Sequence, residues 1–378
     1  MSALYIHIPF CKTQCNYCDF YKSTSYAKTD AYIEALEKEM DFQKDFLKDT
    51  EVKTIYFGGG TPSLLEPSVL QHIINQARKI WNIDKAVEIT VEINPDDATD
   101  EYLTKLAATD VNRISFGLQS FIDRDLQFLG RRHNAKQGLD AVKKARELGF
   151  KNISIDLIFG IPGMSMKEWE KNIVKAIVMD VEHISAYHLT IEPNTPFGKM
   201  ADDGDITPVD ENESEEQYQT IHRLLTDAGF THYEISNYSR GMDLRSKHNC
   251  AYWSGEKYLG LGPSAHSFDG NQRSFVVNRL KDYLDGAGTD AIYGKEMLSS
   301  VDKYNEYVMV ALRTCCGVQR DQLTKHFGLE GLLYFEYGAE KFLRQGLLVR
   351  DENNYKIPPE KFMISNSIIS DLFYVEEG

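Results

Sequence analysis

Three cysteines lie within one short segment near the start of this sequence, PFCKTQCNYCDF. Three residues separate Cys11 from Cys15, and two separate Cys15 from Cys18. Three thiolates on one short loop can bind three irons of a 4Fe-4S cubane, which leaves the fourth iron without a protein ligand and open to an outside chelator. The spacing therefore predicts an iron–sulfur cluster with one open iron.

The other cysteines help to decide between a cluster and zinc. A zinc site needs four protein ligands and commonly draws them from cysteine pairs that lie far apart in the sequence. Cys250 and the adjacent Cys315 and Cys316 show no such ligand spacing, and we interpret them as packed thiols. His7 could complete a zinc shell, so zinc stays the alternative, but the pattern favours the cluster.

A glycine-rich run, FGGGTP, follows a candidate strand at residues 57–62. Such a run can cradle phosphates, but this one lacks the Gly-Lys-Ser/Thr ending that places a lysine on them. Its three glycines allow the backbone to approach a ligand closely, and the carbonyl oxygens are then free to accept from an ammonium group. We expect the run to contact such a group.

The elements that position these residues alternate along the chain to about residue 240. Short runs that are apolar on both faces are typical of strands in a covered sheet, and amphipathic segments between them are typical of helices. The strands are expected at 4–8, 52–57, 87–93, 113–118, 153–159 and 183–189, and helices at 30–47, 67–81, 135–148 and 166–179. Six β-then-α units predict an α/β fold with a parallel sheet curled into a partial (β/α)6 barrel.

Polar residues stand where these expected strands end. Thr61 follows the second strand, Glu92 and Asn94 close the third, Gln119 follows the fourth, and Asp156 belongs to the fifth. In β/α barrels the chemistry takes place at the carboxyl ends of the strands. We therefore expect these side chains to converge on one rim, together with the cysteine loop.

The remainder of the sequence differs in pattern, and we divide the chain into domains 1–240 and 241–378. Helical patterns cover residues 304–313, 320–326 and 332–345. The run LLVRDENNYKI then predicts a hairpin with its turn at 352–354. Three helices and a hairpin resemble a winged-helix module. Such modules often bind DNA, but this one is rich in acidic residues, so we expect a packing or lid role.

Composition excludes several classes of function. The 378 residues carry a formal net charge of -15, which repels phosphate backbones, so we expect no nucleic-acid partner. No stretch approaches the roughly 18 uninterrupted apolar residues of a membrane span. The start, MSALYIHIPF, lacks the basic flank and cleavage site of a signal peptide. We expect a cytoplasmic protein without stable membrane insertion.

Several segments together resemble the HemN/HemW family of radical S-adenosylmethionine (SAM) proteins over almost the whole chain: YIHIPFC, FGGGTPSLL, ISFGLQSF, LGRRH, SIDLIFGIPG and HNCAYW. The resemblance implies a 4Fe-4S cluster whose open iron is chelated by SAM. It also implies which residues contact SAM: Tyr5, Tyr17, Gly59, Gly60, Thr61, Glu92, Gln119, Arg131 and Asp156. Carboxylates suit ribose hydroxyls, and an arginine or glutamine suits a carboxylate. The alternatives are loop packing for Tyr17, a surface ion pair for Arg131 and a turn cap for Asp156.

The family includes an oxygen-independent coproporphyrinogen III oxidase and a heme chaperone, which binds heme and passes it to acceptor proteins. The oxidases carry a further cysteine two positions after the third, where this sequence has Phe20. They also carry an N-terminal extension, whereas Cys11 lies ten residues from this N-terminus. The run HNCAYW matches the HNxxYW motif associated with heme binding in the chaperones. We therefore expect a heme chaperone, with the oxidase or a HemN-like methyltransferase as alternatives.

His248 of this motif is the expected axial ligand of the heme iron, because a neutral imidazole is a normal heme ligand. Tyr252 and Trp253 could pack on the porphyrin face. The alternative is a buried or substrate-lining histidine, and His133 and His266 are weaker candidates for the iron ligand. The expected partners are heme, a heme-acceptor protein and an electron donor. No residue is assigned a catalytic role.

Overall fold

The structure, a computed structural model, describes residues 2–24 and 26–375. Its core is a twelve-stranded sheet in which six consecutive strands run parallel and side by side. These are β1 (Ser2–Ile8), β2 (Val52–Gly59), β3 (Ile83–Ile93), β4 (Arg113–Gln119), β5 (Ile153–Phe159) and β6 (His183–His188). Apolar side chains such as Leu4, Ile6 and Ile8 are fully buried in this sheet.

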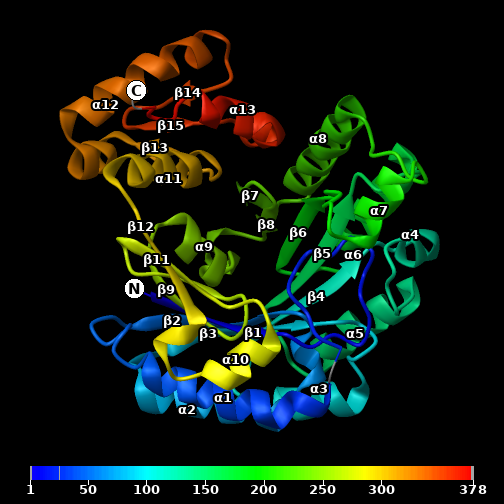
Figure 1. The fold of residues 1–378 in the computed structure, drawn as a ribbon. Coiled ribbons are helices and arrows are strands. Elements are labelled where there is room, and N and C mark those ends of the chain that lie inside the picture. The colour runs from blue at the N-terminus through cyan, green and yellow to red at the C-terminus, as the bar shows by residue number, and fades with distance from the viewer. Residues whose placement is uncertain (1, 25, 376–378) are drawn as a thin grey trace.

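Helices cover the outer face of the sheet (Figure 1). They include α1 (Thr29–Phe42), α2 (Pro67–Ile80), α3 (Asp100–Ala107), α5 (Ala135–Glu147) and α6 (Met166–Val178), and α8 (Glu211–Asp227) packs against α6. In α2 the buried residues Leu70, Ile73, Ile74 and Ala77 recur at helical spacing. The expected α/β fold with six β/α units is confirmed.

Six further short strands extend the sheet at its two ends. They are β7 (Thr231–Glu234), β8 (Asn237–Ser239), β9 (Lys257–Leu261), β10 (His266–Phe268), β11 (Gln272–Val276) and β12 (Tyr293–Met297). The sequence did not predict them, because strands this short give no clear apolar alternation. The order of the described strands runs from β12 to β7 without closing, which confirms the partial barrel.

Strand β9 pairs in parallel with β1, so the sheet continues beyond residue 240. The division of the chain at that residue stays a prediction. Glu39 of α1 links this sheet extension to the helical layer. Its fully buried carboxylate accepts hydrogen bonds from the backbone N–H of Gly262 (2.8 Å) and from the hydroxyls of Tyr283 (2.6 Å) and Tyr293 (2.9 Å).

The Glu39 carboxyl should make the stability of the fold depend on pH. Burial raises its pKa from 4.5 to about 7. A carboxyl whose pKa is raised in the folded state stabilises the fold most below its unfolded pKa, and this contribution is lost as the pH rises through the folded pKa. We expect Glu39→Gln to flatten the fall in unfolding free energy between pH 4.5 and about 7. Urea unfolding of the wild type and of Glu39→Gln across this pH range measures the unfolding free energy. If the free energy falls equally with pH in both proteins, Glu39 does not cause the dependence.

The C-terminal region is helical, as expected. It contains α11 (Ser300–Leu312), α12 (Arg320–Arg344) and α13 (Ser365–Ser370), with a three-stranded sheet of β13 (Val318–Gln319), β15 (Asn354–Lys356) and β14 (Val349–Arg350). The break expected between the helices at 320–326 and 332–345 is present within α12, where Gly328 has a non-helical backbone with φ 70°. No helix in the described part of the chain is long and apolar enough to cross a membrane.

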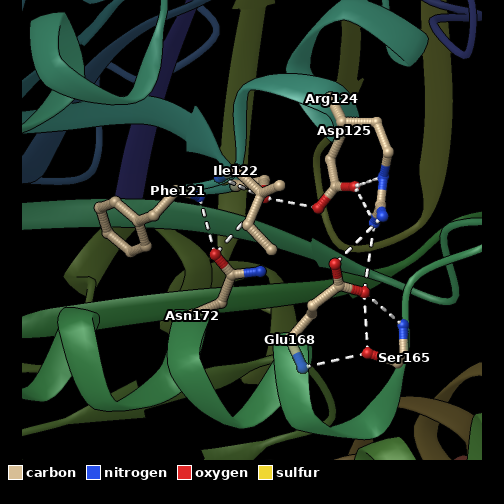
Figure 2. Close-up of polar contacts among 8 residues, drawn as sticks. Phe121, Ile122, Arg124, Asp125, Ser165, Glu168 and Asn172 are labelled. Atoms are coloured by element: carbon tan, nitrogen blue, oxygen red, sulfur yellow. Dashed lines mark hydrogen bonds and ion pairs between the residues drawn. The ribbon is translucent and has the colours of Figure 1, made fainter.

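A polar network fastens the segment after β4 to α6 (Figure 2). The side-chain oxygen of Asn172 accepts from the backbone N–H of Phe121 at 2.8 Å. Arg124, in α4 (Asp123–Phe128), bridges Asp125 and Glu168 with N–O distances of 2.9 and 3.0 Å. This network fixes α4, whose C-terminal end contacts the cysteine loop.

Candidate functional site

The cysteine loop follows directly from β1. Cys11 is buried, Cys15 and Cys18 are half-buried, and all three are free thiols. The Thr61 hydroxyl lies 3.5 Å from the Cys11 sulfur, and Nη1 of Arg131 lies 3.4 Å from the Cys15 sulfur. Burial raises the pKa of the Cys11 and Cys18 thiols. Cationic iron would compensate this cost, because thiolates are the ligands of iron–sulfur clusters.

Among the described residues, no three Cys, His, Asp or Glu side chains are placed to hold a single metal ion. A zinc site would require such convergence on one point. A cubane does not, because each thiolate binds a different iron. Three free thiols on one loop suit a cubane in this respect.

Contacts between the cysteine motif and residues outside it hold this loop in place. Asn16 donates from its side chain to the carbonyl of Phe128 (2.7 Å) and from its backbone N–H to the carbonyl of Leu129 (3.0 Å). On another side, Lys12 pairs with the buried carboxylate of Asp97. The sequence analysis missed Asn16 and Asp97, because isolated polar residues in loops carry no periodic signal.

The glycine run lies directly against the cysteine loop. Gly59 has φ 102°, a conformation that favours glycine. A Cβ on Gly60 would stand 2.6 Å from the Phe10 carbonyl oxygen and 3.1 Å from the Cys11 sulfur. The backbone of the glycine run therefore lies close to its neighbours. At Gly60 the absence of a side chain also leaves room for the cysteine loop.

Arg131 joins several of the expected site residues. Besides the Cys15 sulfur, its guanidinium contacts the Tyr17 hydroxyl (3.5 Å), the Gly117 carbonyl (2.8 Å) and the side-chain oxygen of Asn94. Asn94 in turn donates to the Thr61 hydroxyl (3.4 Å). The structure thus brings the cysteine loop and the ends of β2, β3 and β4 together, as expected for one rim.

A second group of expected residues surrounds Glu92. The Tyr56 hydroxyl donates to the Glu92 carboxylate at 2.8 Å, and the rings of Tyr5 and Tyr56 stack with centroids 6.2 Å apart. The Tyr5 hydroxyl and Nδ1 of His7 are 3.2 Å apart. Burial raises the pKa of Glu92 to about 7. A buried carboxyl of this kind is well suited to accept from ligand hydroxyls.

Asp156 and Gln119 complete the rim. The buried Asp156 carboxyl accepts from Ser115 (3.3 Å) and from Ser185, and burial raises its pKa. Gln119 has φ 66°, unusual outside glycine, and its side-chain oxygen is buried without a hydrogen-bond partner among the described residues. An unpaired buried acceptor is costly. These residues therefore fit a ligand that carries hydroxyl and ammonium donors, as SAM does.

His248, in α9 (Lys247–Trp253), is only 2% exposed. Its Nδ1 lies 2.8 Å from the Thr54 hydroxyl, its Nε2 lies 2.9 Å from the Tyr252 hydroxyl, and its ring stacks on Tyr56. Burial lowers its pKa to about 3, so the imidazole is neutral. Both ring nitrogens are engaged, and coordination of heme iron would require one of these bonds to break. Iron ligation by His248 stays a prediction, subject to that condition.

The two weaker candidates for the iron ligand differ in exposure. His133 is 3% exposed, and its Nε2 lies 3.1 Å from the Leu118 carbonyl oxygen. Burial lowers its pKa to about 4. His266 is exposed on β10, where its ring lies 6.0 Å from that of Phe275. Neither assignment is tested by these contacts.

A sheet of β/α units with three cysteines on the loop after its first strand defines a radical SAM protein, and residues 5–175 match the family model described as the radical SAM superfamily. The chain is 33% identical over 374 residues to the heme chaperone HemW of Bacillus subtilis, covering 97% of this chain and 98% of that protein. It belongs to the HemN/HemW family of radical SAM proteins.

Two other similarities extend over nearly the whole chain. The heme chaperone HemW of Lactococcus lactis is 32% identical, with coverage of 97% of this chain and 96% of that protein. The structure of coproporphyrinogen III oxidase (HemN) from Escherichia coli superposes with a TM-score of 0.83, covering 98% of this chain and 90% of that chain. At 21% sequence identity, this structural match shows a shared fold.

Proposed function

We propose that this protein is a heme chaperone that carries a SAM-bound 4Fe-4S cluster, binds heme and passes it to an acceptor protein. The observation that carries the proposal is the similarity, over nearly the full length, to relatives named heme chaperone HemW. In this proposal the protein works in the cytoplasm, receives electrons from a donor protein, and has no nucleic-acid partner.

The residues around the cysteine loop have distinct roles in this proposal. Cys11, Cys15 and Cys18 would hold the cluster, which when bound would supply electron-transfer chemistry beside SAM. Arg131 places a positive charge beside the Cys15 sulfur. Glu92 and Asp156 offer buried carboxyls to the ligand's hydroxyl groups, and Gln119 offers its unpaired oxygen. The remaining SAM contacts come from Tyr5, Tyr17, Gly59, Gly60 and Thr61.

Oxidation of coproporphyrinogen III is the second candidate function, favoured by the shared fold with HemN. Phe20 argues against it, because it stands where the oxidases carry their further cysteine. The Phe20 side chain is 69% exposed. The phenylalanine ring at this position carries no thiol.

The two functions predict opposite results after anaerobic reconstitution of the cluster. We expect the wild-type protein to bind heme, seen as a Soret band that saturates on titration. We expect no decarboxylation of coproporphyrinogen III when SAM and a reductant are supplied, measured as porphyrin product by chromatography. The E. coli oxidase, assayed in parallel, controls for active reagents. Turnover of coproporphyrinogen by this protein would contradict the chaperone proposal.

A further inference from the structure

A cavity of about 1400 Å³ lies at the end of the sheet opposite the cysteine loop. It is lined by the N-terminal parts of β1, β2 and β3, by α9, and by α11 with the first turns of α12. Figure 1 shows α9 between the strands of the sheet and α11. Pockets that bury organic ligands commonly measure about 300–1,000 Å³. This cavity is therefore large enough for a porphyrin.

Aromatic side chains line the cavity from two sides. From the barrel come Trp253, Tyr252 and Tyr258, the last two in edge-to-face contact with centroids 4.6 Å apart. From the C-terminal helices come Tyr307 and Phe327, whose ring centroids lie 5.8 Å apart. A flat, mainly apolar ligand can cover aromatic surface on both of its faces here.

Three cations of the lining, Arg245, Lys247 and Lys303, have no carboxylate partner among the described residues, and Lys303 instead donates to the side-chain oxygen of Asn271 at 2.8 Å. Other charged residues of the lining pair with one another, Lys53 with Asp84 and Arg273 with Glu306. Arg245 and Lys247 form no salt bridge within 4.0 Å in the part of the chain that the structure describes. In a chain with a net charge of -15, unpaired cations beside an aromatic cavity match a ligand that carries carboxylates.

One side chain that lines the cavity carries an imidazole. His326 is the one histidine among the described lining residues, and it is exposed. Its ring lies near the rings of Tyr307 (6.5 Å) and Phe327 (6.1 Å), and no hydrogen bond to a described residue occupies its nitrogens. His248, in contrast, does not line the cavity, although Tyr252 and Trp253 of the same motif do. An iron held in the cavity can therefore reach His326 without a rearrangement of the fold.

We propose that heme docks in this cavity, with its ring between the aromatic sides, its propionates at Arg245 and Lys247, and its iron ligated by His326. The inference rests on the proposed function as a heme chaperone. His248 then acts as a positioning residue. Its bonds to Thr54 and Tyr252 hold the aromatic side of the cavity against β2.

Titration of hemin and of metal-free protoporphyrin IX into the reconstituted full-length protein tests the iron ligand. We expect His326→Ala to shift the Soret maximum and to weaken hemin binding at least roughly tenfold, as loss of support for a bound metal typically does. Its affinity for protoporphyrin IX should stay at the wild-type value, because that ligand has no iron. His248→Ala removes a positioning residue and not the iron ligand, so it should weaken hemin and protoporphyrin IX to the same extent. His72→Ala is the matched control at an exposed histidine outside the cavity.

Two further variants test the cavity independently of the iron. Arg245→Gln should weaken both porphyrins roughly ten- to a hundredfold, and Val310→Trp, which adds bulk to the lining, should abolish binding of both. Iron content, sulfide content and thermal unfolding show whether each variant is folded. A wild-type Soret band in His326→Ala, or wild-type affinity in Val310→Trp, overturns the proposal while the chaperone function stands. A wild-type protein that binds no heme contradicts the chaperone function itself.

Discussion

Replacement of Cys11, Cys15 or Cys18 by alanine is expected to abolish the iron–sulfur cluster. A cubane that retains only two protein thiolates loses iron readily, because a second iron then has no protein ligand. Each cysteine has its own surroundings, Cys11 beside Thr61 and Cys15 beside Arg131, so no neighbouring thiol can take its place. Iron and acid-labile sulfide, measured after anaerobic purification, should fall to background in all three variants.

The other cysteines provide matched controls. Cys250→Ala, Cys315→Ala and Cys316→Ala should retain the iron and sulfide of the wild type, because these residues lie outside the loop after β1. Loss of the cluster in any of these three variants would show that the ligands have been assigned wrongly. Retention of a full cluster in Cys11→Ala, Cys15→Ala or Cys18→Ala would show the same.

Removal of the Glu92 or Asp156 carboxyl should weaken SAM binding and leave the cluster in place. Glu92 lies at the end of β3 and Asp156 in the middle of β5, so neither belongs to the cysteine loop. A lost hydrogen bond to a charged group costs about 1.5–3 kcal/mol, so the affinity of Glu92→Ala and of Asp156→Ala should fall roughly ten- to a hundredfold. Anaerobic equilibrium dialysis with labelled SAM measures it, with iron content determined on the same samples.

Glu39→Ala controls for the loss of a buried carboxyl as such. Glu39 is fully buried, but it belongs to α1 and contacts the sheet extension. Its removal should cost stability and leave SAM affinity unchanged in the folded protein. Wild-type SAM affinity in folded Glu92→Ala and Asp156→Ala would remove both residues from the site.

The parallel half of the sheet could be predicted because its strands are long apolar runs, each followed by an amphipathic helix. The expected strand at 153–159 coincides with β5, and the expected helix at 67–81 differs from α2 by one residue. The sheet extension could not be predicted. A strand such as β10, with only three residues, exists because its neighbours β9 and β11 supply the hydrogen bonds. No local sequence pattern predicts such pairing.

In the candidate site, too, some residues could be predicted from the sequence and others could not. The cysteines and the rim residues stand out by type and spacing, whereas their supports depend on contacts between distant segments. Lys12 lies within the cysteine motif, but its partner Asp97 is 85 positions away and belongs to no motif. For His248 the sequence indicates more than the structure supports. The sequence motif marks it as special, but only the structure shows that Thr54 and Tyr252 already engage both of its nitrogens.

The strand β1 pairs with both β2 and β9. During synthesis β9 is made long after β1 and β2. At roughly 5–20 residues per second, Lys257 follows Ser2 from the ribosome after tens of seconds. Until then one edge of β1 stays open, and an open edge can pair with other chains. The three cluster thiols emerge beside that edge. A nascent chain that stalls before β9 (Lys257–Leu261) therefore carries an unpaired strand edge directly before the three oxidisable cysteines.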